Sequence, residues 1–225
     1  MLTALRTFWR DDRASVAIEA LIVMPILTWV FVASFVFFDA YRVYNTSIKA
    51  TYAVADVLSR RTSEIASSDI EGLAGVFQFL TQNTAGSSMR VTQITRQAGG
   101  YRIDWSHGTN GKTYVRPSDF PDFIDRIPIM AFGDKMLLIE TILPYRPAFA
   151  AGLSDQEYVN FTVTRPRFAG QVAFDADMAN SYVYSNSGAA TGQDGFYYID
   201  GAPDDGSDDN PDWDHWNNWG HNVTN

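Results

Sequence analysis

Cysteine is absent from this chain of 225 residues, which excludes disulfide bonds, thiolate nucleophiles and cysteine-based zinc sites. Histidine is scarce, and its three positions, His107, His215 and His221, do not form a metal-ligand spacing such as His-Glu-x-x-His. The sequence also lacks a Gly-x-Ser-x-Gly elbow and a glycine-rich phosphate loop. Glu140 and Asp134 stand at strand ends without a partner motif, so a solvated surface position or a salt bridge explains them better than catalysis. We therefore expect no enzyme, no metal and no other cofactor.

Positive charge is also in short supply, and the formal net charge is −9. Residues 200–225 contain seven aspartates and no lysine or arginine, so most of the excess negative charge lies in this acidic tail. The rest of the chain is close to balanced and shows no basic face that could follow a phosphate backbone. Nucleic acid is therefore not an expected partner.

A long apolar run occupies residues 16–38, VAIEALIVMPILTWVFVASFVFF, in which Glu19 is the only ionisable side chain. At about 1.5 Å per residue this run spans roughly 35 Å, enough to cross a hydrocarbon core of about 30 Å. The apolar region of a secretory signal is much shorter, about 7–15 residues, and helices in the core of soluble proteins usually keep a polar face. The run predicts a single-pass transmembrane helix.

The orientation of this helix follows from the charges at its two ends. Arg6, Arg10 and Arg13 precede the run, whereas Arg42 and Lys49 follow it. This slight excess favours a cytoplasmic N-terminus. In a bacterium, the remaining 185 or so residues would then lie in the periplasm, outside the inner membrane.

Two residues inside the run need a physical reason. A carboxylate such as Glu19 within a span costs a few kcal/mol unless it is paired or close to the interface. Either Glu19 lies at the headgroups as a spectator, or it pairs with a cation of another chain. Pro25 lacks the N–H that would bond to Leu21, so the helix should loosen there. Such a kink would suit packing into a filament, although membrane helices also tolerate proline without any such role.

The stretch of residues 13–25, RASVAIEALIVMP, resembles the N-terminal signature of TadE-like pilus proteins. That signature has a charged leader, a small residue, a glutamate, an apolar run and a proline, and Arg13, Glu19 and Pro25 are in register with it. Residues 137–147, LLIETILPYRP, are similar to the family's strand and Tyr-x-Pro turn. Residues 161–167, FTVTRPR, are similar to its closing strand. The resemblance covers roughly residues 5–167 and concerns TadE/TadG-like minor pilins or pseudopilins of the bacterial Tad type IV pilus system.

The resemblance implies a structural or assembly subunit in cell adhesion, with other Tad pilus subunits, the prepilin peptidase and inner-membrane lipid as partners. It implies cleavage between Ala14 and Ser15, although the family usually has glycine where Ala14 stands. Glu19 would then be the fifth residue of the mature chain and could meet the new ammonium group at Ser15 of a neighbouring subunit. Cleavage or retention of the leader stays open, as does the choice between a filament subunit and a membrane-resident assembly factor.

The expected fold is α+β, with residues 1–14 as a cytoplasmic leader and residues 15–59 as a transmembrane helix that continues into the periplasm. Residues 60–170 should form the periplasmic domain, with a second helix near residue 68 and strands at 89–97, 101–106, 135–143 and 157–164. These form an antiparallel sheet of about four strands against the long helix. The face of the helix expected to pack on the sheet carries Tyr41, Tyr44, Ile48, Tyr52, Ala55 and Leu58.

Residues 171–225 form the predicted C-terminal extension with its acidic, tryptophan-rich tail. Trp213, Trp216 and Trp219 are spaced by three, which leaves open a solvated tail or a binding surface. Asp208 begins a pattern similar to a calcium loop, but the glycine and glutamate that an EF-hand requires are missing. The alternative function is therefore a single-pass membrane-anchored periplasmic binding protein or adhesin.

Overall fold

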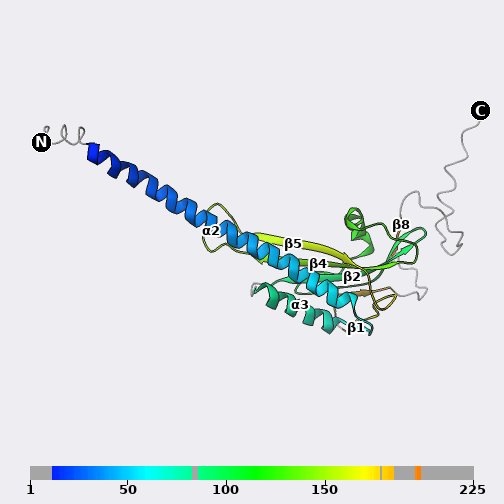
Figure 1. The fold of residues 1–225 in the computed structure, drawn as a ribbon. Coiled ribbons are helices and arrows are strands. Elements are labelled where there is room, and N and C mark those ends of the chain that lie inside the picture. Colours follow the sequence, from blue (N-terminus) through cyan, green and yellow to red (C-terminus); the bar gives the residue numbers. More distant parts are fainter. Residues whose placement is uncertain (1–11, 83–85, 178, 185–195, 199–225) are drawn as a thin grey trace, which may run out of the picture.

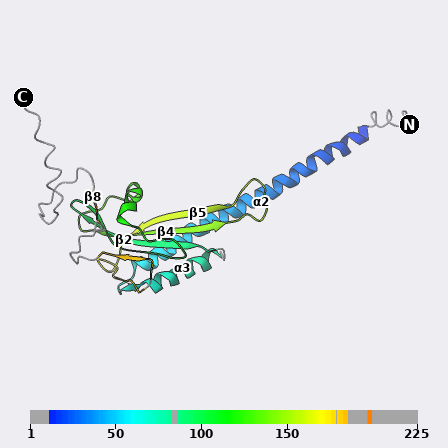
Figure 2. The ribbon, with the colours of Figure 1, turned by 180° about the vertical axis from the view of Figure 1, so that it is seen from behind.

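The computed structural model describes residues 12–82, 86–177, 179–184 and 196–198. One long helix, α2 (Asp12–Ser59), projects by its N-terminal half from a domain of mixed helix and sheet (Figure 1). At about 1.5 Å per residue its 48 residues extend about 72 Å. The view from behind shows the domain packed along the C-terminal half of α2 (Figure 2). The expected helix over residues 15–59 is confirmed, and it runs through Pro25 without interruption.

The remaining elements are strands, with one α-helix and one 3-10 helix among them. In chain order they are β1 (Ile65–Ala66), α3 (Ser67–Thr81), β2 (Ser88–Gln97), β3 (Gly100–Gly108), the 3-10 helix η1 (Pro117–Arg126), β4 (Lys135–Tyr145), β5 (Gln156–Thr164), β6 (Phe174–Asp175), β7 (Ser181–Val183) and β8 (Phe196–Tyr198). The predicted tail and its three tryptophans, together with the leader up to residue 11, lie outside the described residues.

The main sheet is antiparallel, with the strand order β5-β4-β2-β3-β7, and β8 also pairs with β3. Its four long strands are those expected from the sequence, but β7 and β8 enlarge the sheet beyond the expected four. Both come from the segment that we expected to lie outside the domain, and β6 of the same segment pairs with β1. The expected division near residue 170 therefore separates parts that the structure joins. The physical reason is the burial of apolar surface, since Val172 is only 1% exposed and belongs to the core.

The sheet carries a hydrophobic cluster on each face. Helices α2 and α3 cover one face, where the central residues are Val54, Leu58, Ile70, Phe77, Leu137 and Ile139. The 3-10 helix η1 contributes to the other cluster, which contains Ile94, Ile103, Phe120, Phe123, Met136 and Leu138. Each buried side chain of this size stabilises the fold by about 1.5–3 kcal/mol, so the domain is held by packing on both faces.

A β-bulge divides strand β3 between these two clusters. The pairing partners shift between Gln93–Trp105 and Ile94–Ile103, which leaves Asp104 as an extra residue. Ile103 and Trp105, which the alternation in the sequence assigns to one face, therefore pack in different clusters. Burial alone would raise the pKa of Asp104, but hydrogen bonds from Thr95 and Gln93 and the charge of Lys135 hold this pKa below its ordinary value.

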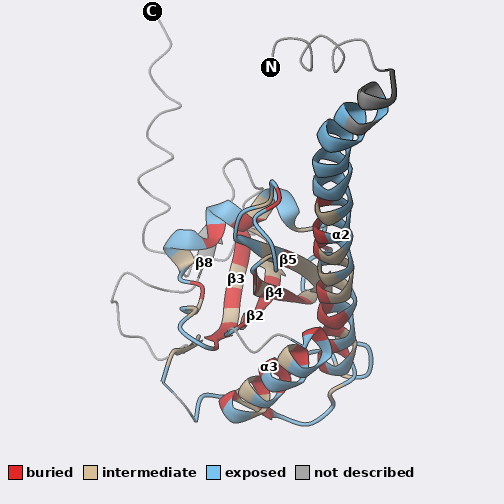
Figure 3. Cartoon of the chain, turned by 90° about the vertical axis from the view of Figure 1, so that its left-hand side faces the viewer, coloured by how far each residue is buried: buried red, intermediate tan, exposed pale blue. Residues whose placement is uncertain are grey.

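The face of α2 that meets the sheet agrees with the expected one only in part. Ala55 and Leu58 are buried in the core, as predicted, whereas Tyr41 and Tyr52 are 67% and 61% exposed, so the prediction that these tyrosines pack on the sheet is wrong. Small residues take their place, namely Ala40, Ser47, Ala50, Thr51 and Val54. Short side chains allow the helix to approach the strands closely, whereas a tyrosine on this face would hold them apart. Figure 3 shows this buried stripe on the C-terminal half of α2 and the exposed surface of its N-terminal half.

Two carboxylates cap the N-terminus of α3. The Asp69 carboxylate accepts the Ala66 N–H, at 3.2 Å. Asp177, more than 100 residues away in the chain, accepts hydrogen bonds from the Ser68 N–H and hydroxyl at 3.3 and 3.0 Å. Desolvation alone would raise the pKa of Asp177, but the hydrogen bonds from Ser68 and Ser67 hold this pKa below its ordinary value. The segment after residue 170 therefore caps α3 as well as extending the sheet.

Within the described part of the chain, one helical segment, Ile18–Ser59, is long and apolar enough to cross a membrane. Only 11% of its most apolar window is buried inside the protein. Core helices of soluble proteins are mostly buried, and this segment is not. The projecting half of α2 is thus compatible with a single transmembrane anchor.

Candidate functional site: the long helix and its junction with the sheet

All four residues singled out from the sequence lie on the first part of α2. The bond between Ala14 and Ser15 falls within the first helical turns, since the helix begins at Asp12. Glu19 and Pro25 are exposed on the same helix. Among the described residues, Glu19 takes part in no ion pair within the chain. The structure therefore presents Glu19 on an exposed helix surface, with no cation at ion-pair distance among the residues whose side chains it describes.

Glu19 and Asp39 mark the two ends of the uncharged part of α2. At about 1.5 Å per residue, the step of 20 positions from Glu19 to Asp39 corresponds to about 30 Å, which matches the thickness of a bilayer core. No Asp, Glu, Lys, Arg or His lies between them. The two carboxylates can thus sit at opposite borders of the membrane, which lowers the energetic penalty expected for Glu19 inside a span.

Three tyrosines form a cluster just beyond Asp39, where α2 meets β4 and β5. The Tyr145 hydroxyl donates a hydrogen bond to Asp39 Oδ2 at 3.0 Å, and the Tyr158 hydroxyl donates to the carbonyl of Ala40 at 3.3 Å. The Tyr158 ring stacks on Tyr145 and meets Tyr44 edge to face, with centroid distances of 5.6 and 5.4 Å. Tyrosine is enriched at membrane–water borders because its ring is apolar and its hydroxyl is wet. This tyrosine cluster (Tyr44, Tyr145 and Tyr158) fits that position.

The electrostatics of the tyrosine cluster keep its hydroxyl groups protonated. Burial, together with the hydrogen bond to Asp39 and its negative charge, raises the pKa of Tyr145 to about 12. Burial and the Asp39 charge also raise the pKa of Tyr158. Both hydroxyls therefore remain hydrogen-bond donors throughout the physiological pH range and tie β4 and β5 to the helix.

A second group, the polar junction, joins α2 to the sheet one to three turns further along. It consists of Ser47 and Thr51 on α2, Thr141 on β4 and Asn160 on β5, all of them buried. The Thr51 and Thr141 hydroxyls are 2.7 Å apart, and the Asn160 amide donates to Ser47 Oγ at 3.0 Å. A buried polar group without a partner is destabilising, so these bonds fix one register of the helix on the strands.

The sequence analysis missed the polar junction, although a signal was present. Ser47 and Thr51 lie one turn apart on a face otherwise made of small apolar residues such as Ala40, Ala50 and Val54. Small and hydroxyl side chains at helical spacing indicate a close contact between a helix and another element. The large tyrosines nearby suggested the wrong face.

The carboxylates considered from the sequence lie in salt bridges, as expected. Glu140 is buried against the guanidinium of Arg90, and this guanidinium lies over the ring of Phe123. Asp134 pairs with Arg165 at 2.8 Å. These contacts join neighbouring strands on the face covered by η1, so they account for the carboxylates structurally.

His107, Ser181 and Glu71 lie together in a way that superficially resembles a hydrolytic triad. His107 Nδ1 is 2.7 Å from Ser181 Oγ, while Nε2 lies 3.5 Å from a Glu71 carboxylate oxygen. The histidine at the centre of the group is 1% exposed, and Ser181, which is partly buried, also has its Oγ 3.0 Å from Ser67 Oγ. The group joins β3, β7 and α3, and we interpret it as a packing contact.

The described part of the chain contains no group of three or more His, Cys, Asp or Glu placed to hold a metal ion. The features that remain for function are the exposed half of α2 and its rigid junction with the domain. Comparison with protein-family models, curated proteins and solved structures finds no match to this chain.

Proposed function

We propose that the chain is a structural or assembly subunit, a minor pilin or pseudopilin, of a Tad-type pilus involved in adhesion and biofilm formation. In this proposal α2 anchors it in the bacterial inner membrane, with the N-terminus in the cytoplasm and the domain in the periplasm. The observation that carries the proposal is the form of α2. One uninterrupted helix has an exposed apolar half for lipid or other subunits and a second half fixed to an antiparallel sheet.

The rigid junction supports a structural role. The polar junction and the tyrosine cluster fix both the register and the exit angle of α2 relative to the sheet. A subunit that stacks through its helix needs this rigidity, because each domain must follow its helix into a defined position. A flexible tether would suffice for an anchored binding protein.

Glu19 is the second support. It is exposed, it has no ion pair among the described residues, and it lies one helical turn after Ser15. Cleavage before Ser15 would create an ammonium group close to the same membrane border. A Glu19 carboxylate and a neighbouring subunit's ammonium group could then neutralise one another in a setting of low dielectric constant.

The test is to express Glu19→Ala and Glu19→Gln in a pilus-forming strain and to measure membrane insertion, processing and surface pili separately. Insertion should be unchanged, because removal of a carboxylate makes the span more apolar. Intact mass should show the loss of residues 1–14. Surface pili should fall at least about tenfold, because an ammonium group left unpaired in an apolar setting costs about 3–5 kcal/mol.

Glu64→Gln is the matched control, since Glu64 is an exposed glutamate of the domain and should leave piliation unchanged. Equal piliation and equal co-purification with other Tad subunits in the wild type and both Glu19 variants would show that Glu19 does not mediate assembly.

A further inference from the structure

The loop between β4 and β5, residues 146–155, runs back along α2 toward the N-terminal half of the helix. Its tip is apolar, with the sequence PAFAAGL at residues 147–153. Ala151 is buried against Ala33 and Val36 of α2, and Leu153 packs on the same cluster. Phe149 nevertheless remains 55% exposed. The tip is therefore attached to the predicted transmembrane segment while it presents an aromatic side chain outward.

The contacts of the tip set its depth relative to the membrane border. Val36 and Ala33 precede Asp39 by three and six residues, which along the helix axis correspond to about 5 and 9 Å. Interfacial segments bury their apolar faces about 5–10 Å into the headgroup and acyl boundary. If α2 spans a bilayer with Asp39 at its border, the tip lies at that depth.

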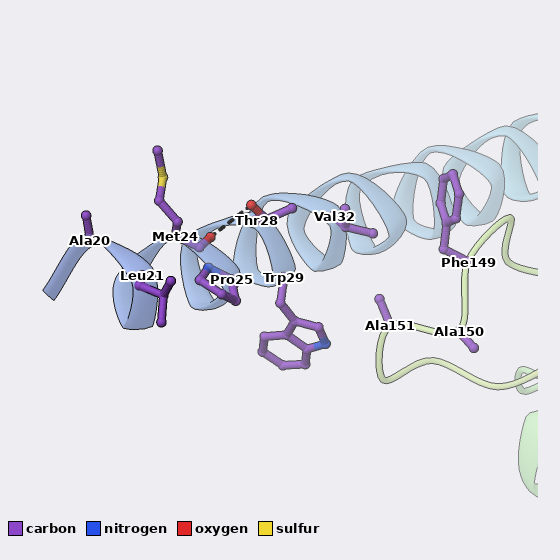
Figure 4. Close-up of a pocket in the computed structure, with 10 residues that line it drawn as sticks. All are labelled: Ala20, Leu21, Met24, Pro25, Thr28, Trp29, Val32, Phe149, Ala150 and Ala151. Carbon is purple, nitrogen blue, oxygen red and sulfur yellow. Dashed lines mark hydrogen bonds between the residues drawn. The ribbon is translucent and has the colours of Figure 1, made fainter. Parts of the chain in front are cut away.

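An open apolar groove of about 960 Å³ continues from the tip along α2. Figure 4 shows Trp29 on the same side of the helix as Ala150 and Ala151. The Thr28 hydroxyl, which borders the groove, donates to the Met24 carbonyl at 2.9 Å, so it does not require water. An acyl chain can fill such a groove, because flexible hydrocarbon requires neither hydrogen bonds nor a fixed shape.

The polar groups of the loop agree with a shallow position. Arg146 and Asp155 stand at its two bases, form an ion pair at 3.4 Å and are largely exposed. Charged side chains there can remain among headgroups while the tip enters the acyl boundary. Irregular backbone does not occur at lipid-exposed positions deep in the hydrocarbon, so the loop can insert only at the interface.

We propose that the tip of the β4–β5 loop (residues 147–153) inserts into the outer interface of the phospholipid bilayer beside α2. It forms a second, shallow membrane contact that fixes the tilt and rotation of the domain on the membrane. The inference rests on α2 spanning a bilayer and goes beyond the pilus assignment, which could fail without affecting it.

The experiment exploits the absence of cysteine. Full-length chains with a single Ala150→Cys or Phe149→Cys change are labelled with an environment-sensitive fluorophore and reconstituted in phosphatidylethanolamine and phosphatidylglycerol vesicles. Quenching is measured with aqueous iodide and with lipids that carry a nitroxide at a shallow or a deep acyl position. Ile129→Cys is the matched control, because Ile129 is an apolar residue 98% exposed that precedes the other end of β4.

The expected result is quenching of the tip labels by the shallow nitroxide several-fold more strongly than at Ile129, and more strongly than by the deep nitroxide. Iodide should quench Ile129 preferentially. Iodide quenching at the tip equal to that at Ile129 would overturn the proposal. Protection from both quenchers would also overturn it, because protein, such as a second copy of the chain, would then cover the tip.

Phe31→Cys on α2 tests the premise, since Phe31 lies near the middle of the uncharged part of the helix and is 73% exposed. Its label should respond to lipid nitroxides and resist iodide. A Phe31 label open to iodide would refute the spanning of α2 and, with it, the insertion of the loop. The count of surface pili in a pilus-forming strain is a separate experiment. Its result tests the pilus assignment and leaves the insertion of the loop untouched.

Discussion

At the scale of single residues, Thr51 and Thr141 show how α2 is fixed to the sheet. Thr51→Val should destabilise the full-length chain by about 1–2 kcal/mol, because the buried Thr141 hydroxyl loses its partner at 2.7 Å. The double variant Thr51→Val with Thr141→Val should lose less than the sum of the single changes. Chemical unfolding in detergent, followed by circular dichroism, measures these differences.

Thr46→Val is the control for this pair. Thr46 lies on the same helix and also donates to the carbonyl four residues earlier, at 2.9 Å, but no bond to the sheet involves it among the contacts described. Its replacement should change stability by about 0.5 kcal/mol or less. Additive effects of the two single changes at Thr51 and Thr141 would contradict a direct coupling.

His107 makes the stability of the domain depend on pH. Burial lowers its pKa from the ordinary value of 6.5, and the opposing charges of Glu71 and Asp177 only partly offset this effect. The folded state thus favours the neutral ring, and the unfolded state binds more protons once the pH falls below 6.5. The free energy of unfolding should therefore decrease as the pH falls through this value, by at most about 1.4 kcal/mol per pH unit.

Thermal unfolding of the full-length chain between about pH 8 and pH 5 measures this dependence. His107→Gln, which can still form a hydrogen bond with Ser181 but does not titrate, should show a smaller loss over the same interval. An unchanged slope in that variant would assign the pH dependence to other groups.

At the scale of elements, the segment after residue 170 belongs to the domain. The Trp105 indole N–H donates to the carbonyl of Val172 at 2.9 Å, and the Trp105 ring stacks on Phe174 at 4.5 Å. A chain that ends at residue 170 should lose about 3–5 kcal/mol of stability, because it loses buried apolar surface and leaves this N–H unpaired. A chain that ends at residue 198 keeps these contacts and should exceed the shorter chain in stability by this amount.

Unfolding curves of the two truncated chains, recorded in the same detergent, provide the comparison. Equal midpoints would show that β6 and β7 add nothing to the fold. The prediction also means that a soluble fragment intended for study without the anchor should extend past residue 170.

The long elements were predictable because their signals are local. The apolar run of α2, the hairpin around Gly99 and the alternation of β4 and β5 each lie within a short window of sequence. The bulge at Asp104 and the pairing of β6 with β1 depend on contacts between distant segments, which no local window contains. The buried face of α2 was predicted correctly at Ala55 and Leu58 but not at Tyr41 and Tyr52. Two stripes share the same helical spacing, and only the close approach of the sheet selects the one with small side chains.

Of the candidate site, the sequence identified Glu19 and Pro25 on the helix but not the contacts that orient the helix. Tyr145 and Tyr158 lie more than 100 residues after Asp39 in the chain, and their hydrogen bonds to Asp39 and Ala40 exist only after β4 and β5 have docked. The Glu140 salt bridge was expected as a type of contact, whereas its partner Arg90 follows from the pairing of β2 with β4.

At the scale of the whole molecule, the projecting N-terminal half of α2 is a lipid-compatible stalk. The C-terminal half of the helix holds the domain at a fixed angle to this stalk. The uncharged part between Glu19 and Asp39 corresponds to about 30 Å of helix, and the domain begins immediately beyond it. A molecule with this form can be held by a bilayer through the stalk. The same apolar surface can pack against the helices of neighbouring subunits when lipid is exchanged for protein.

The most direct test of the proposed function is a count of surface pili in a strain that carries a Tad system, after deletion of this chain and after its restoration. The proposal predicts that deletion reduces the pili at least about tenfold, the change expected when assembly loses a contact worth 1.4 kcal/mol or more, and that the full-length chain restores them. Undiminished pili in the deletion strain would contradict a role for the chain in building the pilus.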